Sequence, residues 1–217
     1  MKVVVATLVC DHKAYSVDRV IENNRRLETP DGVEKLVYLN IESALSLSHV
    51  NARYSGLIEW KLDAYDIWRW TSSWRMPRKK DQDQHHRLPA IVQARNMARE
   101  YAIHVDADAI LYIDSDVLAP KDSIAKLLEA GEDIVSGVVP GRGVHSRVQY
   151  MGSGLYKSHI RDNLYALDYA TAGFVLIRSN VFKAIAWRWG WTRISKEPWS
   201  EDPIFGYDAR EAGYGWG

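Results

Sequence analysis

Short runs of almost continuous apolar residues recur along the chain, and stretches with helical spacing separate them. The runs cover residues 3–9, 36–39, 109–113 and 134–139. They predict strands buried on both faces, because polar residues do not alternate regularly within them. Helices are predicted for residues 16–27, residues 52–70, the stretch after Pro89 and the stretch from Pro120 to Gly131. This order predicts an α/β fold in which helices cover both faces of a mostly parallel sheet.

The pattern changes from Pro140 onward, where glycines interrupt short β-like segments. Three of these segments, residues 149–156, 163–167 and 174–177, predict a small antiparallel β annex. A last helix is predicted to start at Ser200 and to be closed by Gly213. We therefore expect a single domain over residues 1–217 that consists of two halves, residues 1–139 and 140–217.

The composition narrows the class of protein. Lys plus Arg equals Asp plus Glu at 28 each, which argues against a protein whose main task is to bind nucleic-acid phosphates. The single cysteine excludes an internal disulfide framework and suits a reducing compartment. No window approaches the ~20 apolar residues of a membrane-spanning helix. We expect a cytoplasmic protein with no transmembrane segment and no nucleic-acid partner. Nine Trp and twelve Tyr suit either a core or the recognition of sugar faces.

Three Asp-x-Asp motifs occur, and their context separates them. The motif at residues 81–83 lies in a polar stretch with no apolar period, 74–87, whose cations are either solvated or available to phosphates. The motif at 106–108 precedes the apolar run 109–113, and Asp114-Ser115-Asp116 follows that run. Open α/β sheets bind ligands at the carboxyl ends of their strands. The third motif is therefore the candidate site.

Two adjacent carboxylates at a strand end repel each other and lose hydration when a ligand covers them. A divalent cation relieves both penalties, and Mg²⁺ or Mn²⁺ commonly bridges carboxylates to substrate phosphates. We predict that Asp114 and Asp116 bind such a cation. The alternative is a capped turn in which both aspartates accept hydrogen bonds from nearby amides.

Residues 110–117, Ile-Leu-Tyr-Ile-Asp-Ser-Asp-Val, resemble the Asp-x-Asp segment of GT-A glycosyltransferases. Residues 93–98, Gln-Ala-Arg-Asn-Met-Ala, resemble the helix upstream of it in family-2-like members. The resemblance implies a GT-A fold that binds a nucleotide-sugar across strand ends, with residues 1–139 as the nucleotide-binding half. It places Asp116 on the metal, and Asp114 near the ribose or on the metal through water.

The same resemblance implies further donor contacts. Arg95 would help to hold the donor, with Ser115 beside it, and the alternative for Arg95 is an ion pair on the helix surface. The end of the first strand, including Thr7 and Val9, would edge the base pocket. Gly173, before the apolar residues 174–177, would let the backbone approach the donor sugar, or else it marks a bulge.

A second acidic pair lies near the end of the chain, in Trp199-Ser200-Glu201-Asp202. It resembles the late Glu-Asp motif of the same enzymes, where an acid accepts the proton of the acceptor hydroxyl. A positioned base of this kind contributes roughly 10²–10⁴-fold to the rate. We predict Asp202 as the base of an inverting transfer, with Glu201 and Trp199 in contact with sugar. The alternative is a capped helix whose first-turn acids complement the helix dipole.

The sequence lacks one metal ligand that is common in this family. Many relatives carry a histidine beyond the last helix that completes the metal shell, and none follows Gly213 here. The metal then rests on Asp116, phosphates and water, or else His145 or His159 takes that place. Retention or inversion stays open for the same reason.

The expected function is metal-dependent transfer of a sugar from a UDP- or GDP-sugar to a hydroxyl of a glycan, lipid or protein acceptor, by the catalytic half 140–217. We allow for a homodimer. A phosphohydrolase of the haloacid dehalogenase kind also places Asp-x-Asp after an apolar strand, but it favours Thr or Val where this chain has Leu118. A nucleotidyltransferase is a second enzymatic alternative, because it also binds a nucleotide together with a metal ion. A carbohydrate-binding module without chemistry is the non-enzymatic alternative.

Overall fold

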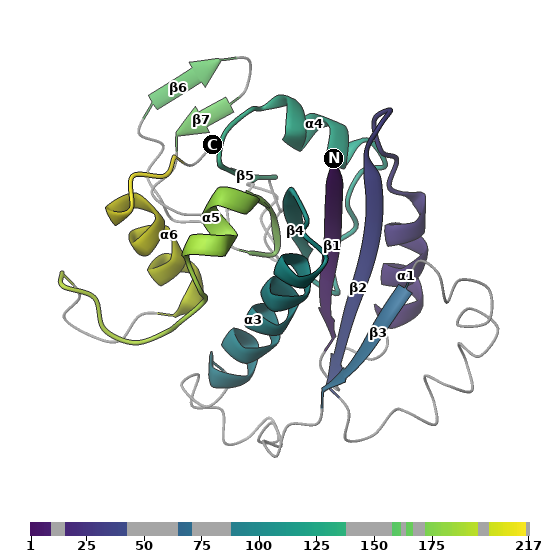
Figure 1. Ribbon diagram of the computed structural model, residues 1–217, viewed down its shortest axis with the longest axis horizontal. Helices are drawn as coiled ribbons and strands as arrows, with labels where there is room; N and C mark the ends of the chain where they lie inside the picture. The colour runs from purple at the N-terminus through teal and green to yellow at the C-terminus, as the bar shows by residue number, and fades with distance from the viewer. Residues whose placement is uncertain are drawn as a thin grey trace, which may run out of the picture.

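The computed structural model describes residues 1–9, 16–42, 65–70, 88–137, 158–161, 164–166, 172–194 and 200–215 (Figure 1). Its centre is a six-stranded sheet with the order β3-β2-β1-β4-β8-β5. Strands β6 (Ser158–Arg161) and β7 (Leu164–Ala166) form a separate antiparallel pair.

Four neighbouring strands of the sheet pair in parallel, namely β1 (Lys2–Val9), β2 (Glu34–Glu42), β3 (Tyr65–Trp70) and β4 (Ala109–Ile113). Strand β1 lies between β2 and β4, with Ala6 level with Tyr112. Strand β8 (Phe174–Arg178) is antiparallel and lies between β4 and β5 (Ile134–Ser136). The carboxyl ends of β1 and β4 therefore meet at one edge of the sheet, where the antiparallel β8 begins.

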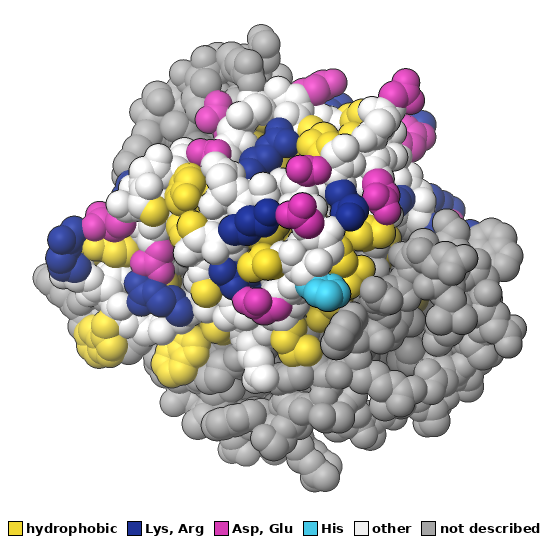
Figure 2. Space-filling view, in the orientation of Figure 1, with side chains coloured by type: hydrophobic (Ala, Val, Ile, Leu, Met, Phe, Trp, Pro, Cys, Tyr) yellow, Lys and Arg dark blue, Asp and Glu magenta, His cyan; other side chains and the backbone are white. Residues whose placement is uncertain are grey.

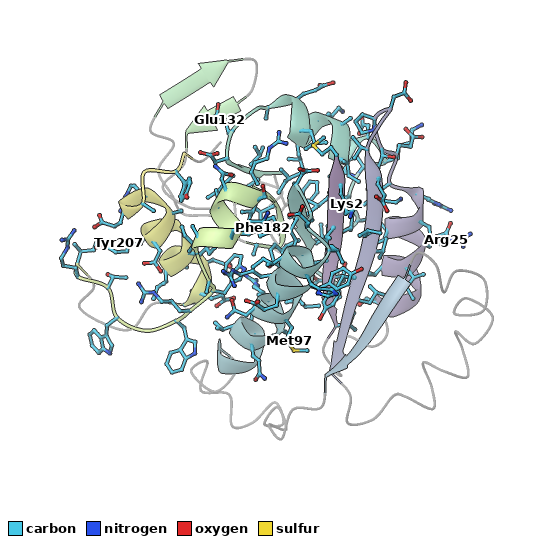
Figure 3. All side chains as sticks on the ribbon, in the orientation of Figure 1. Lys2, Arg25, Met97, Glu132, Phe182 and Tyr207 are labelled. Carbon is cyan, nitrogen blue, oxygen red and sulfur yellow. The ribbon has the colours of Figure 1, made fainter. Side chains whose placement is uncertain are left out.

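Helices cover both faces of the sheet, and each face has its own core. Helices α3 (Leu88–His104), α5 (Ser179–Ala184) and α6 (Glu201–Glu211) lie on one face, where Val4 and Ala6 of β1 are buried with Phe182 and Phe205. Helices α1 (Val17–Arg26) and α4 (Ser123–Glu129) lie on the other, against Val3 and Val5. Neighbouring residues of β1 point to opposite faces and both are buried, which explains its continuous apolar run. Figure 3 shows Phe182 among the side chains between α5 and the sheet.

The predicted α/β fold is confirmed, but two predicted elements are wrong. Residues 65–70 were expected in a helix and instead form β3, which pairs with β2 in parallel. Residues 174–177 were expected in the annex and instead form most of β8 inside the main sheet. Strand β2 is also longer than the apolar run 36–39 predicts, and strand β6 and helix α5 were not predicted. Residues 74–87 and 149–156 lie outside the described part of the chain.

Acidic and basic side chains are mixed on the described part of the visible surface. Figure 2 shows Lys and Arg side chains interspersed with Asp and Glu across the described part of this face. This agrees with the equal numbers of acidic and basic residues in the sequence. Within the described residues, no helix combines the length and the apolar character that crossing a membrane requires.

Candidate functional site

The Asp114-Ser115-Asp116 turn leaves the carboxyl end of β4, a strand with all five residues buried. The backbone N–H of Asp114 donates to the carbonyl of Gly173 at 2.9 Å, and the N–H of Val117 donates back to the carbonyl of Asp114 at 2.9 Å. Gly173 therefore lies directly beside Asp114, although the two are far apart in sequence. Asp114 and Asp116 are half-buried, so both remain accessible from the sheet edge.

Ser115 differs from its two acidic neighbours. Its side chain is only 2% exposed, and its Oγ has no hydrogen-bond partner among the described residues. A buried hydroxyl without a partner costs stability, typically by about 1–3 kcal/mol. Ser115 is therefore a buried polar group at the strand end whose hydroxyl makes no hydrogen bond among the described residues.

The Asp106–Asp108 motif lies at the opposite, amino end of β4, where its carboxylates contact residues that are distant in sequence. Asp106 is exposed, has a φ of 49°, and pairs with Lys183 at 2.8 Å. Asp108 accepts a hydrogen bond from the backbone N–H of Lys2 at 2.6 Å. The motif at residues 81–83 lies outside the described residues. Of the two described motifs, only the Asp114–Asp116 turn stands at the strands' carboxyl ends.

The second acidic pair begins α6, and one arginine from α3 holds both of its members. Glu201 and Asp202 lie in the first turn of α6, and Ser200 is the N-cap residue without a side-chain capping bond. The guanidinium of Arg95 is hydrogen-bonded to Asp202 Oδ1, and it lies 3.4 Å from Glu201 Oε1. Arg95 is 5% exposed and Glu201 6% exposed, so this is a buried ion pair rather than a surface one.

The charge of Asp114, in the Asp-x-Asp turn, acts on Arg95 and Glu201. Burial alone would lower the pKa of Arg95, but the charges of Asp202, Glu201 and Asp114 raise it. Burial raises the pKa of Glu201 above its ordinary value; Arg95 opposes this rise, while Asp202 and Asp114 add to it. Asp114 is thus close enough to act on both Arg95 and Glu201. The structure brings together one guanidinium and three of the predicted carboxylates.

A further residue of this cluster, Trp187, was not singled out from the sequence. Its ring stacks on Phe205 of α6 with centroids 4.1 Å apart, and the guanidinium of Arg95 lies 4.7 Å from its centroid. Its Nε1 donates to the hydroxyl of Tyr112, which donates to the carbonyl of Arg95 at 3.0 Å. In the sequence, Trp187 is one of nine tryptophans and belongs to no motif.

The other predicted residues lie in different settings. Thr7 and Val9 are buried near the carboxyl end of β1, and Thr7 Oγ1 accepts a hydrogen bond from Asn24 at 3.1 Å. Trp199 and His145 lie outside the described residues, and of His159 only the backbone, in β6, is described. Roles for these residues stay predictions.

The donors at the sheet edge fit a cation that is shared with a ligand. No group of three or more acidic, histidine or cysteine side chains that could hold an ion occurs within the described residues. Asp114 and Asp116 nevertheless present two partly exposed carboxylates, and Mg²⁺ is usually bound by one or two carboxylates together with substrate phosphates. This donor set suits that mode and not an all-protein cage.

Comparison with known proteins gives similarity at the level of structure. A scan against models of protein families gives no match, and a search among curated proteins also gives none. TarS from S. aureus, solved with UDP-GlcNAc, is 15% identical with a TM-score of 0.58 over 100% of this chain. The mannosyltransferase PcManGT from Pyrobaculum calidifontis, solved with GDP-Man and Mn²⁺, is 12% identical with a TM-score of 0.56 over 99%. GalNAc-T7, solved with UDP, GalNAc and Mn²⁺, is 11% identical with a TM-score of 0.69 over 100%.

This chain spans 58%, 53% and 42% of the lengths of those three proteins, respectively. All three are GT-A glycosyltransferases. At these identities the likeness establishes the fold and not the reaction. The parallel strands β1 to β4, the antiparallel β8 inserted beside β4 and the helices on both faces give this chain the GT-A fold of those glycosyltransferases.

Proposed function

We propose that this chain transfers a sugar from a UDP- or GDP-sugar to a hydroxyl acceptor, with a divalent cation bound at Asp114 and Asp116. One observation carries the proposal: Arg95 pairs with Glu201 and Asp202, and its backbone carbonyl accepts a hydrogen bond from Tyr112, two residues before Asp114, so the acidic pair lies beside the strand that carries the Asp-x-Asp turn. An inverting transferase needs both parts, because the leaving diphosphate and the attacking hydroxyl are then on opposite sides of one sugar carbon. The solved structures with UDP-GlcNAc, GDP-Man and Mn²⁺ support the same ligand class.

The charge of the cluster supports cation binding. Among the described residues, the cluster holds the guanidinium of Arg95 and four carboxylates, those of Asp114, Asp116, Glu201 and Asp202, which leaves three negative charges when all are ionised. Bringing a diphosphate to this edge without a counter-charge is unfavourable because like charges repel at close range. A bound Mn²⁺ or Mg²⁺ supplies Lewis acidity for the departing nucleoside diphosphate. Asp114 and Asp116 would hold this cation, and among the described residues the buried hydroxyl of Ser115 between them has no hydrogen-bond partner.

The acidic pair supports proton transfer from the acceptor. Asp202 is half-buried in the first turn of α6, where it is more accessible than the buried Glu201. In the proposed reaction Asp202 accepts the hydroxyl proton while Arg95 fixes its carboxylate, and a single displacement inverts the anomeric centre. Glu201 contacts the sugar beside it. A glycan, lipid or protein hydroxyl as acceptor, a homodimer and a cytoplasmic location remain part of this proposal.

A thermal-shift panel tests the proposal. Wild-type protein is mixed with UDP, GDP, ADP or CDP, each with and without Mn²⁺, and the melting temperature is measured. We expect stabilisation by UDP or GDP that requires the metal, because a ligand that binds only the folded state raises its stability. The sugar donors of the stabilising base are then assayed for transfer to hydroxyl acceptors. Hydrolysis of phosphate monoesters, with no nucleotide effect, would instead indicate a phosphohydrolase of the haloacid dehalogenase kind.

A further inference from the structure

We propose that Trp187 is a positioning residue, whose indole ring holds the Arg95 guanidinium in the orientation that binds Glu201 and Asp202 together. The inference rests on the proposed function only for the roles of Asp202 as the base and of Glu201 as a sugar contact. The contacts of Trp187 themselves are properties of the protein without substrate.

The indole ring touches all three elements that build the site. It stacks on Phe205 of α6 at an interplanar angle of 19°, which places it one turn beyond the acidic pair. It meets Tyr112 of β4 edge-on with centroids 5.5 Å apart, two residues before Asp114. The guanidinium of Arg95, from α3, lies over the ring. A displacement of this ring therefore affects α3, β4 and α6 at once.

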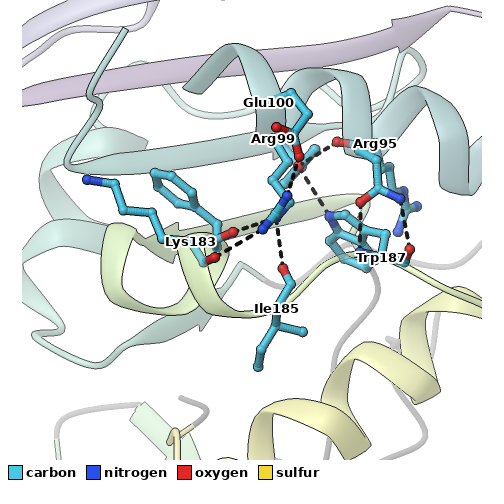
Figure 4. A network of polar contacts seen from close by, with 9 residues as sticks. Arg95, Arg99, Glu100, Lys183, Ile185 and Trp187 are labelled. Atoms are coloured by element: carbon cyan, nitrogen blue, oxygen red, sulfur yellow. Dashed lines mark hydrogen bonds and ion pairs between the residues drawn. The ribbon is translucent and has the colours of Figure 1, made fainter. Parts of the chain in front are cut away.

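Polar contacts from α3 fix the backbone that carries the ring. Asn96 Nδ2 donates to the carbonyl of Trp187 at 2.8 Å, and Asn96 Oδ1 accepts from the N–H of Trp187 at 2.9 Å. Arg99, one turn further along α3, donates to the carbonyls of Phe182, Lys183 and Ile185 at 2.5–3.0 Å (Figure 4). These contacts satisfy carbonyl groups at the carboxyl end of α5 and hold the segment up to Trp187 against α3.

The guanidinium needs such a platform because of its own flexibility. An arginine side chain has many rotamers, and ordering it costs conformational entropy. Stacking on an aromatic face removes that freedom while leaving the planar fork of N–H groups free to bind carboxylates. The hydroxyl of Tyr112 secures the backbone on the other side, and burial raises the pKa of this phenol, so that it stays a neutral donor.

This role differs from the donor contact expected for Arg95 from the family resemblance. If Arg95 positions the acidic pair, loosening it misplaces a base and slows the chemical step. If Arg95 holds the donor, loosening it weakens donor binding. Steady-state kinetics separates the two, because the first effect appears in kcat and the second in the KM for the donor.

The kinetic experiment compares Trp187→Phe and Trp187→Leu with wild type. A phenyl ring preserves stacking and leucine does not, so we expect Trp187→Leu to lower kcat by about 10²-fold with little change in donor KM, as for a misplaced catalytic group. Trp187→Phe should keep kcat within about fivefold of wild type, since an aromatic face remains although the indole N–H and one of the two fused rings are lost. Trp191→Leu is the matched control, because Trp191 belongs to the same segment and is 61% exposed. A rise in donor KM with unchanged kcat would overturn the positioning role.

A second measurement needs no substrate. In ¹⁵N NMR spectra of the arginine side chains, a stacked and ion-paired guanidinium shows resolved N–H signals that exchange slowly with water. We expect the Arg95 signals to persist in Trp187→Phe and Trp191→Leu, and to average out in Trp187→Leu while the backbone spectrum stays folded. Unchanged Arg95 signals in folded Trp187→Leu would refute the inference. If the Arg95 signals change as expected but wild type transfers no sugar, the proposed function fails and the positioning of Arg95 by Trp187 stands.

Discussion

Asp106 lies three residues before strand β4 and Asp116 lies three residues after it. Replacing each of them in turn gives a direct test of the metal site. Asp116→Asn removes one carboxylate from the carboxyl end of β4, and Asp106→Asn removes one from the amino end. The φ of 49° at Asp106 is tolerated by asparagine, so the second change preserves the backbone. At 100 times its Kd a ligand stabilises the folded state by about 2.7 kcal/mol. We expect Asp116→Asn to lose most of the Mn²⁺-dependent shift with UDP or GDP in thermal melts.

Asp106→Asn should keep that shift unchanged, although the variant loses the exposed ion pair with Lys183. Equal shifts in wild type and Asp116→Asn would remove Asp116 from the proposed metal ligands.

Glu201 makes the stability of the metal-free protein depend on pH. Burial raises the pKa of Glu201 in the folded state, so the folded protein binds this proton more tightly than the unfolded chain. Where the unfolded state binds fewer protons, stability falls as pH rises. The contribution of Glu201 is therefore complete below its ordinary pKa of about 4.3 and is lost as pH rises through the raised value.

Glu201→Gln removes this titration while it keeps the shape of the side chain. We expect the unfolding free energy of Glu201→Gln minus that of wild type to increase from pH 4 upward, and to level off once Glu201 is ionised. Urea unfolding in EDTA at a series of pH values measures the difference. A difference that declines with pH would show that Arg95 outweighs burial and holds the folded-state pKa below its ordinary value.

At the scale of elements, the close approach of β5 and β8 next to the site depends on Gly137. Its N–H donates to the carbonyl of Phe174 at 3.0 Å, and a Cβ placed on it would lie 2.1 Å from two ring carbons of Phe174. The ring must move, and overpacking of this kind typically costs about 1–3 kcal/mol. We expect Gly137→Ala to lower the unfolding free energy by that amount, measured by urea titration.

Gly215→Ala is the matched control, since the nearest atom to its added Cβ is Glu132 Oε2 at 3.6 Å, an ordinary contact. If both variants are equally stable, Phe174 has room that the structure does not show. Phe174 follows Gly173, so a moved ring should also weaken nucleotide binding at the Asp114 turn.

The sequence predicts a helix or strand correctly where one periodicity dominates. It does not predict which elements pair or pack with one another. The run at 109–113 is apolar throughout, so its burial and its acidic end could be predicted together. Residues 65–70 also fit a helical spacing when read with those before them, and their pairing with β2 overrides it. Nothing in the apolar pattern of 174–177 specifies whether it pairs with β4 or with an annex. The contact between Arg95 and the acidic pair depends on how α3 packs on α6, which no local pattern encodes.

At the scale of the whole molecule, the two ends of the sheet should respond differently to a ligand. The amide of Asp114 bonds to Gly173 and that of Val117 to Asp114, both at the carboxyl edge of β4. The amides of Asp108 and Ser179 bond to Lys2 and Asp108 at the opposite edge. Parallel strands align all their carboxyl ends, so a nucleotide-sugar that spans β1, β4 and α6 contacts the first edge and cannot reach the second.

Hydrogen exchange followed by NMR measures both edges in one experiment. With UDP or GDP and Mn²⁺ at 100 times the Kd, amides that exchange only after the ligand leaves should slow by about 100-fold, the factor equivalent to the binding free energy. We expect this for Asp114 and Val117, while Asp108 and Ser179 keep their rates unless they exchange through global unfolding. Uniform slowing at both edges would mean that exchange occurs by global opening, which added urea reveals. Slowing at the amino edge alone would place the ligand at the wrong end of the sheet and contradict the proposed site.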